Sequence, residues 1–92
     1  MKSFKAHLAK ELKDRDFRVA FEAEKELLDV AVKVAKLREK KGLSQTELAK
    51  QADVTQQQVS KIENGFNCNV MTLLKVLRAL NLKMNVTPTR VA

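Results

Sequence analysis

The sequence predicts an all-α fold, in which a helix-turn-helix lies within a five-helix domain, a helical extension precedes the domain and a short β-strand follows it. The first observation is a pair of capping boxes, Ser44 with Glu47 and Thr55 with Gln58, eleven residues apart. In each box the hydroxyl accepts from the third backbone N–H of a helix, and the Glu or Gln accepts from the cap. This spacing brackets a short helix and a turn, as a helix-turn-helix requires. The second observation is the recurrence of apolar residues at helical spacing on both sides of the motif.

The apolar residues of the stretch 42–65 are expected to face a common core. They are Leu43, Leu48, Ala49, Ala52, Val54, Val59 and Ile62. Asp53 lies in the turn, where a left-handed backbone is expected. Aspartate tolerates that conformation better than most residues do, so the turn is expected to form with some strain.

Two amphipathic stretches begin the chain, separated by the polar residues 14–16. Residues 3–13 predict one helix, capped by Ser3, and Asp16 is placed to cap a second. Their apolar positions are Phe4, Leu8, Leu12, Phe17, Ala20 and Phe21.

No Gly or Pro is present between Asp16 and Lys41, so the sequence leaves open whether this stretch is one long helix or two. We expect a kink or break near residues 24–28. A further apolar stripe then follows the helical period and ends at Gly42, after two lysines suited to a helix C-terminus. Its members are Leu27, Ala31, Val34 and Leu37.

Asn69 is expected to cap a helix over residues 70–80, and Asn81 to end it in a left-handed conformation. The inward residues of this helix are expected to be Leu73, Leu74, Leu77 and Leu80. The tail then alternates, with Leu82, Met84 and Val86 on one face, as a half-buried strand does. Because a lone strand cannot satisfy its backbone groups, we expect it to pair with the same strand of a second subunit.

Composition places the chain among small basic domains. Its 92 residues suffice for one domain, and the net charge of +7 favours an anionic partner, although many basic surfaces are only solvated. No apolar run of about 18 residues is present, so no membrane span is expected. The charged first sixteen residues do not fit a secretory signal, and Cys68 is the only cysteine. A soluble cytoplasmic protein is expected.

No constellation of an enzyme can be assembled from the sequence. His7 is the only histidine and has no ligand at metal-binding spacing, so a solvated side chain is expected. There is no glycine-rich phosphate loop, no metal-ligand cluster and no nucleophile with a base. We therefore expect a protein that is not an enzyme and has no metal or cofactor.

Three motifs carry a resemblance to a known family: Gly-Leu-Ser-Gln-x-x-Leu-Ala (42–49), Thr-Gln-Gln (55–57) and Val-Ser-x-Ile-Glu-Asn-Gly (59–65). Together they resemble the five-helix DNA-binding domain of phage repressors and their bacterial relatives, the Xre/Cro family. Asp53 departs from that family, which usually has Gly in the turn. The resemblance implies that Arg38 and Glu63 form a partly buried ion pair; the alternative is two unpaired surface charges.

The second helix of the motif carries polar side chains on the face away from its apolar residues. By the resemblance, Gln56, Gln57 and Lys61 occupy base-reading positions, with Ser60 on the same face. A Gln amide can both donate and accept, as the N6 and N7 of adenine require, and Lys can reach O6 or N7 of guanine. The alternative is a polar face that is only solvated. Candidate phosphate contacts, each of which can equally be a cap or turn residue, are Gln45, Thr55, Asn64, Asn67 and Asn69.

The whole chain has a second resemblance. A short helix, the Asp-Phe-Arg-x-Ala-Phe-Glu segment within residues 14–22, a repressor domain and a terminal strand resemble HigA-type antitoxins of type II toxin–antitoxin systems. Such antitoxins neutralise HigB, a RelE-like mRNA-cleaving toxin, and as dimers repress their own operon through palindromic operator DNA. The proline common between their second and third helices is absent here. The terminal strand is also similar to that of HipB-type antitoxins, which lack such an extension.

The resemblance divides the chain into residues 1–26, a helical extension and candidate toxin-binding region; 27–81, the DNA-binding domain; and 82–92, a strand and tail that dimerise. The candidate toxin-binding residues are Phe4, Leu8, Leu12, Phe17 and Phe21, and the candidate dimerisation residues are Leu82, Met84 and Val86. The alternative for the extension is that it only covers the domain's own core. Two other functions stay open: a plain transcriptional regulator with no toxin partner, and an interaction module that binds no DNA.

Overall fold

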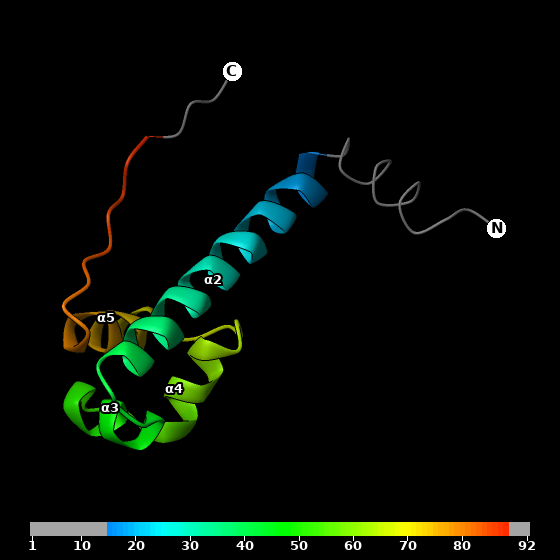
Figure 1. Cartoon of the computed structure of the whole chain (residues 1–92). Coiled ribbons are helices and arrows are strands. Elements are labelled where there is room, and N and C mark those ends of the chain that lie inside the picture. The colour runs from blue at the N-terminus through cyan, green and yellow to red at the C-terminus, as the bar shows by residue number, and fades with distance from the viewer. Residues whose placement is uncertain (1–14, 89–92) are drawn as a thin grey trace.

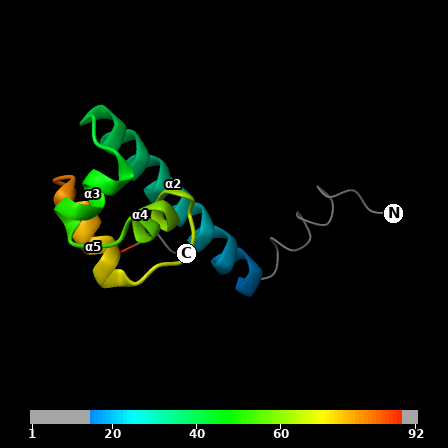
Figure 2. The ribbon, with the colours of Figure 1, turned by 90° about the horizontal axis from the view of Figure 1, so that it is seen from below.

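The computed structural model describes residues 15–88, which form four α-helices (Figure 1). They are α2 (Arg15–Lys40), α3 (Gln45–Ala52), α4 (Gln56–Glu63) and α5 (Val70–Ala79). The helix expected over residues 3–13 lies outside the described residues. Helices α3, α4 and α5 pack around the C-terminal half of α2, while the N-terminal half of α2 projects away from them (Figures 1 and 2).

Helix α2 is continuous over its 26 residues, so the break expected near residues 24–28 is wrong. No helix-breaking residue interrupts its sequence, and the boundary placed between residues 26 and 27 falls inside the helix. Its buried residues are Ala31 and Val34, and none of the described residues before Ala31 is buried. The first half of α2 is therefore largely exposed. No helix within residues 15–88 is both long and apolar enough to cross a membrane.

All four described helices end in the same hydrogen-bonded closure. A residue with positive φ follows each helix: Gly42 (72°), Asp53 (58°), Gly65 (73°) and Asn81 (60°). The next residue donates its N–H to the carbonyl five positions back, at 2.8 to 3.1 Å: Leu43 to Arg38, Val54 to Ala49, Phe66 to Lys61 and Leu82 to Leu77. This is the Schellman motif, which satisfies carbonyls at the helix end. The left-handed backbone expected at Asp53 and Asn81 is confirmed.

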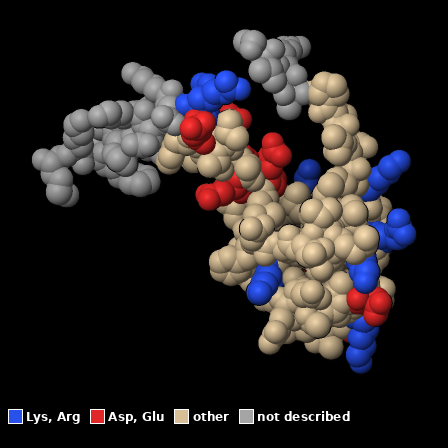
Figure 3. Space-filling model, turned by 180° about the vertical axis from the view of Figure 1, so that it is seen from behind, with Lys and Arg blue, Asp and Glu red and all other residues tan. Residues whose placement is uncertain are grey.

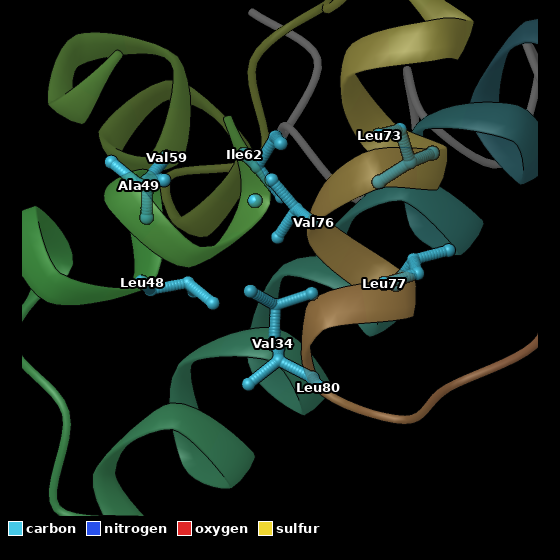
Figure 4. Close-up of a cluster of buried hydrophobic side chains, with 10 residues drawn as sticks. Val34, Leu48, Ala49, Val59, Ile62, Leu73, Val76, Leu77 and Leu80 are labelled. Carbon is cyan, nitrogen blue, oxygen red and sulfur yellow. The ribbon is translucent and has the colours of Figure 1, made fainter. Parts of the chain in front are cut away.

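One apolar core holds the four helices together (Figure 4). The buried residues of the helix-turn-helix are Leu48, Ala49, Ala52, Val59 and Ile62, as expected; Val54 packs against them and Leu43 is half-buried. In α5 the expected stripe was partly wrong. Leu74 is 38% exposed, whereas Val76 is completely buried. Leu73, Val76, Leu77 and Leu80 are spaced as i, i+3, i+4 and i+7, which keeps them on one helix face and leaves Leu74 at its edge.

The C-terminal segment forms no strand within the described residues. A strand is defined by backbone pairing with a neighbour, and no other described segment of this chain is extended alongside residues 82–88. Leu82 packs against the chain's own core, whereas Met84 is 39% and Val86 94% exposed. The alternation expected in the sequence therefore leaves two of its three apolar residues uncovered in the single chain.

Substitutions of Asp53 are expected to test the left-handed end of α3. Asp53→Gly raises the free energy of unfolding by about 0.5–1 kcal/mol, because glycine adopts positive φ without a Cβ clash. Asp53→Ala lowers it by about 1 kcal/mol. The Asp53 side chain is 98% exposed and lies 4.0 Å from Lys75, so lost side-chain contacts contribute little. Denaturant unfolding measures both changes. A glycine variant no more stable than the native chain would contradict the strain, and an alanine variant as stable as the native chain would contradict the better tolerance of aspartate.

Candidate DNA-binding interface

Helices α3 and α4 are joined by a short turn, and both begin with the expected capping box. The Ser44 hydroxyl accepts from the Glu47 N–H at 3.0 Å, and the Ser44 N–H donates to Glu47 Oε1 at 3.0 Å. The corresponding distances for Thr55 and Gln58 are 3.1 and 2.9 Å. These caps satisfy backbone N–H groups that an eight-residue helix would otherwise leave unpaired. The Ser44 hydrogen bonds also lower the pKa of Glu47, so their contribution to stability is lost as the pH falls through that depressed pKa.

The start of α4 presents the predicted base-reading residues to solvent. Val59 and Ile62 are buried, whereas Gln56, Gln57 and Lys61 are exposed and Ser60 is half-buried. This arrangement fixes one face of α4 against the core and leaves the other free for a ligand. Helix N-termini of this kind enter the DNA major groove with their first residues toward the base edges.

The ion pair expected between Arg38 and Glu63 is present and two-pronged. Arg38 Nε donates to Glu63 Oε2 at 2.6 Å, and Arg38 Nη2 donates to Glu63 Oε1 at 2.9 Å. Arg38 Nη1 also donates to the carbonyl of Leu43 at 2.7 Å. The side chains of Arg38 and Glu63 are only 14% and 7% exposed, respectively. Hydrogen bonding to Glu63 raises the pKa of Arg38, and the fork ties the end of α2 to the end of α4.

Two glutamines connect across the turn of the motif, which the sequence did not reveal. Gln56 Nε2 donates to Gln45 Oε1 at 2.7 Å, and Gln45 Nε2 donates to Glu63 Oε1 at 3.3 Å. Each of these glutamines directly follows the cap of its helix, which was the available indication that they lie close together. Gln45 was predicted as a phosphate contact; the structure places it between the ion pair and a candidate base-reading residue.

The remaining candidate phosphate contacts lie at helix ends, except Asn67. Thr55 accepts from Gln58 and keeps its own O–H as a donor. Asn64 donates to the carbonyl of Ser60 at 2.7 Å, and Asn69 Oδ1 accepts from the N–H of Met71 at 2.8 Å. Asn67 is exposed in the loop between α4 and α5. The asparagines at 64 and 69 thus have structural partners, and phosphate contact at each stays a prediction.

The projecting half of α2 carries a second candidate surface. The rings of Phe17 and Phe21 stack with centroids 6.4 Å apart, and neither residue belongs to the core cluster. Leu28 lies on the same helix face and is 54% exposed. A Cβ atom on Gly65 would be 2.6 Å from Leu28 Cδ2, so this stripe reaches the loop that carries the exposed Phe66. Phe4, Leu8 and Leu12, predicted for the same surface, lie outside the described residues.

Acidic side chains outnumber the basic Arg15, Arg18 and Lys25 along the same half of α2, and further basic side chains are spread over the body of the domain (Figure 3). The acidic residues are Asp16, Glu22, Glu24, Glu26 and Asp29. Apolar and acidic side chains together favour a partner whose own surface is apolar and basic.

Other chemistry is sparse in the described residues. Within 15–88, no group of three or more His, Cys, Asp or Glu side chains is placed to hold a metal ion. Cys68 is half-buried in the loop before α5, and burial raises the pKa of its thiol. A raised pKa lowers the thiolate fraction, which makes this cysteine a poor nucleophile at neutral pH.

Comparison with known proteins gives one finding about the family. A protein-family model described as helix-turn-helix matches residues 34–86, which is more than half of the chain. The match begins in α2 and includes α3, α4 and α5. No match was found among curated proteins.

Removal of one ion-pair partner is expected to be strongly destabilising. Arg38→Met leaves the Glu63 carboxylate nearly buried and unpaired, which costs about 3–5 kcal/mol. The double variant Arg38→Met, Glu63→Leu recovers most of that loss, because no buried charge remains. Lys36→Met, at an exposed position of the same helix, serves as the control for loss of a cation. Chemical unfolding measures all three; a single variant as stable as the control would show that the pair contributes little.

Proposed function

The chain belongs to the helix-turn-helix family, of the Xre/Cro type, and on that premise we propose that it is an antitoxin that represses its own operon as a dimer. The family consists of sequence-specific DNA-binding transcriptional regulators. The proposal adds a palindromic operator, a homodimer and a cognate RelE-like, mRNA-cleaving toxin of the HigB type. The observation that carries the DNA-binding part is the exposed start of α4, with Gln56, Gln57 and Lys61 directed away from a buried Val59 and Ile62.

The α4 residues are suited to read bases rather than only to attract phosphate. Two neutral amides stand at the N-terminus of the helix, where bidentate pairing with adenine becomes possible. The net charge of +7 adds long-range attraction to the DNA backbone, which is independent of sequence. In a dimer the two recognition helices enter successive major grooves about 34 Å apart.

Gln57→Ala is expected to weaken operator binding by about 1–3 kcal/mol through the loss of discrimination at one base pair. Binding titrations against operators that differ at single positions measure this effect. Gln51→Ala, at an exposed position of α3, is the control. A loss that is the same for every DNA sequence would make Gln57 a positioning contact instead.

The dimer part of the proposal is supported by uncovered apolar side chains on α5 and the tail. Met71 is 60% exposed and lines a groove on α5 together with Leu74, and Leu74 also lines a second groove, which α5 shares with residues 82–84. The backbone of the extended tail beyond Leu82 has no pairing partner among the described residues. A second copy offers both a strand edge and an apolar surface, which is the economical way to cover them.

Only the apolar face of the tail, with Met84 and Val86, is expected to be needed for dimerisation. The double variant Met84→Lys, Val86→Lys adds charge on the apolar face and yields monomers in sedimentation experiments. It also weakens binding to a palindromic operator by about tenfold or more, because the two half-sites lose their linkage. Asn85→Lys with Thr87→Lys adds the same charge on the alternate face and leaves the dimer intact. Dimers that persist in the first variant would refute the strand pairing.

The toxin-binding part is supported by the projecting half of α2. This half is longer than packing against α3, α4 and α5 requires, and it exposes Phe21 and Leu28 beside acidic residues. A protein that cleaves mRNA needs a basic surface to bind RNA, and such a surface complements an acidic, apolar helix. The plain regulator remains the alternative, in which α2 only completes the fold.

Phe21→Asp is expected to lower affinity for the cognate RelE-like toxin, which the proposal expects to be a small basic protein encoded beside this gene, by about 100-fold, since an aromatic contact buried in the complex is lost and a charge is introduced. Val19→Asp is the matched control, because Val19 is 60% exposed and lies about 160° around the same helix. Calorimetry with the purified neighbour measures both, and its mRNA cleavage in the presence of each variant gives a second readout. If the neighbour neither binds nor is inhibited, the chain is a plain regulator.

A further inference from the structure

A continuous series of side-chain hydrogen bonds runs from the nearly buried ion pair to the start of α4. Arg38 Nη2 and Gln45 Nε2 both donate to Glu63 Oε1, at 2.9 and 3.3 Å. Gln56 Nε2 then donates to Gln45 Oε1 at 2.7 Å. We refer to Arg38, Glu63, Gln45 and Gln56 as the relay.

The direction of the relay follows from its acidic member. A glutamine amide has a donor end and an acceptor end of nearly the same shape, and a half-turn exchanges them. A carboxylate paired with arginine can only accept. Glu63 therefore requires Gln45 to present its NH2 group, which leaves the Gln45 oxygen for the next residue. That oxygen in turn requires Gln56 to present its own NH2 group.

The exposed end of the relay then has a defined pattern. Gln56 keeps its Oε1 acceptor and one N–H donor for a ligand, because its other N–H is bound to Gln45. One donor beside one acceptor is the pattern that pairs with N7 and N6 of adenine. An amide turned the other way would offer two N–H donors, which pair with the O6 and N7 acceptors of guanine.

We propose that Glu63 is a positioning residue that sets the base preference of Gln56 through Gln45, an inference that rests on the proposed DNA-binding function. Glu63 touches no base in this arrangement. Its negative charge orients two amides in sequence, and the Arg38 fork holds that charge in place. The buried pair at the end of α2 thereby determines what the start of α4 offers to DNA.

The conservative substitution Glu63→Gln is expected to reverse the relay. Arg38 Nε and Nη2 bind different oxygens of Glu63, and Gln45 shares the oxygen bound by Nη2. The new amide is expected to keep its oxygen on Arg38 Nε, lose the hydrogen bond from Nη2 and turn its NH2 group toward Gln45. Gln45 must then accept from that NH2 group with its oxygen, and its own NH2 group donates to the oxygen of Gln56. Gln56 is left with two donors toward the groove, so its preference moves from adenine to guanine.

The test is selection of random DNA duplexes by the full-length protein and its variants, followed by sequencing. Gln56→Ala first identifies the operator columns that depend on Gln56. In those columns, Glu63→Gln is expected to shift the ratio of adenine to guanine by about tenfold or more toward guanine. Arg38→Lys is the control for weakening of the ion pair: it lowers the melting temperature but keeps Glu63 an acceptor, so the adenine preference remains.

A second variant does not touch the ion pair and covers the case in which Glu63→Gln fails to fold. Gln45→Met interrupts the relay with a side chain of similar shape and is expected to remove the base preference at the operator positions that depend on Gln56. Gln51→Met, on the exposed face of α3, leaves that preference unchanged. Unaltered columns in a folded Glu63→Gln variant, or in Gln45→Met, would overturn the proposal. A uniform loss of affinity in Gln45→Met would likewise overturn it and make Gln45 a phosphate contact alone.

Failure of the underlying function gives a different result. If the native chain enriches no DNA sequence, the proposed regulator function is wrong. If it enriches an operator but Gln56→Ala changes no operator position, the regulator function is supported, but Gln56 reads no base. That result also overturns the inference.

Discussion

The arrangement of this domain depends on the fork between Arg38 and Glu63. It joins the last turn of α2, the carbonyl of Leu43 and the last residue of α4. Helices α3 and α4 have eight residues each, which is too short for stability in isolation. The core holds them by Leu48, Val59 and Ile62, but apolar contacts alone permit some rotation of a short helix about its axis. A nearly buried ion pair permits little of this rotation, because a misplaced donor leaves a buried charge without its hydrogen bond. The fork therefore fixes the direction in which α4 presents its polar face.

Local signals in the sequence predicted the parts of the fold that are decided locally. The two capping boxes, the left-handed positions at Asp53 and Asn81 and the helix-turn-helix core all depend on residues within a few positions of one another. The errors came from weaker criteria. The break expected in α2 had no breaking residue behind it, and continuous helix propensity prevailed. In α5, four leucines suggested the inward face, whereas the i, i+3, i+4, i+7 spacing selects Val76 and excludes Leu74.

The residues of the candidate site could be predicted from the sequence, but the hydrogen bonds between them could not. The exposed face of α4 follows from the period of Val59 and Ile62, and the structure places Gln56 and Gln57 on it. The hydrogen bond between Gln45 and Gln56 depends on the distance between two helix starts across a turn, which no local pattern encodes. The tail illustrates a different limit. Pairing of residues 82–86 needs a second chain, so neither the sequence nor one folded chain can supply the partner strand.

The distribution of charge gives the two candidate surfaces separate places on the molecule. The chain has a net charge of +7, yet Glu22, Glu24, Glu26 and Asp29 lie together on α2. These residues precede Ala31, the first buried residue of α2, and Glu24 lines a hollow with Gly65 and Asn67 of the loop after α4. Carboxylates beside the start of α4 would oppose DNA binding by repulsion from phosphate. The loop that Glu24 approaches follows the other end of α4, and eight helical residues span about 12 Å, so physiological salt screens part of that repulsion. Leu28 of the apolar stripe lies beside Gly65, after the end of α4 opposite to Gln56. The candidate stripe on α2 and the candidate base-reading residues therefore lie toward opposite ends of α4.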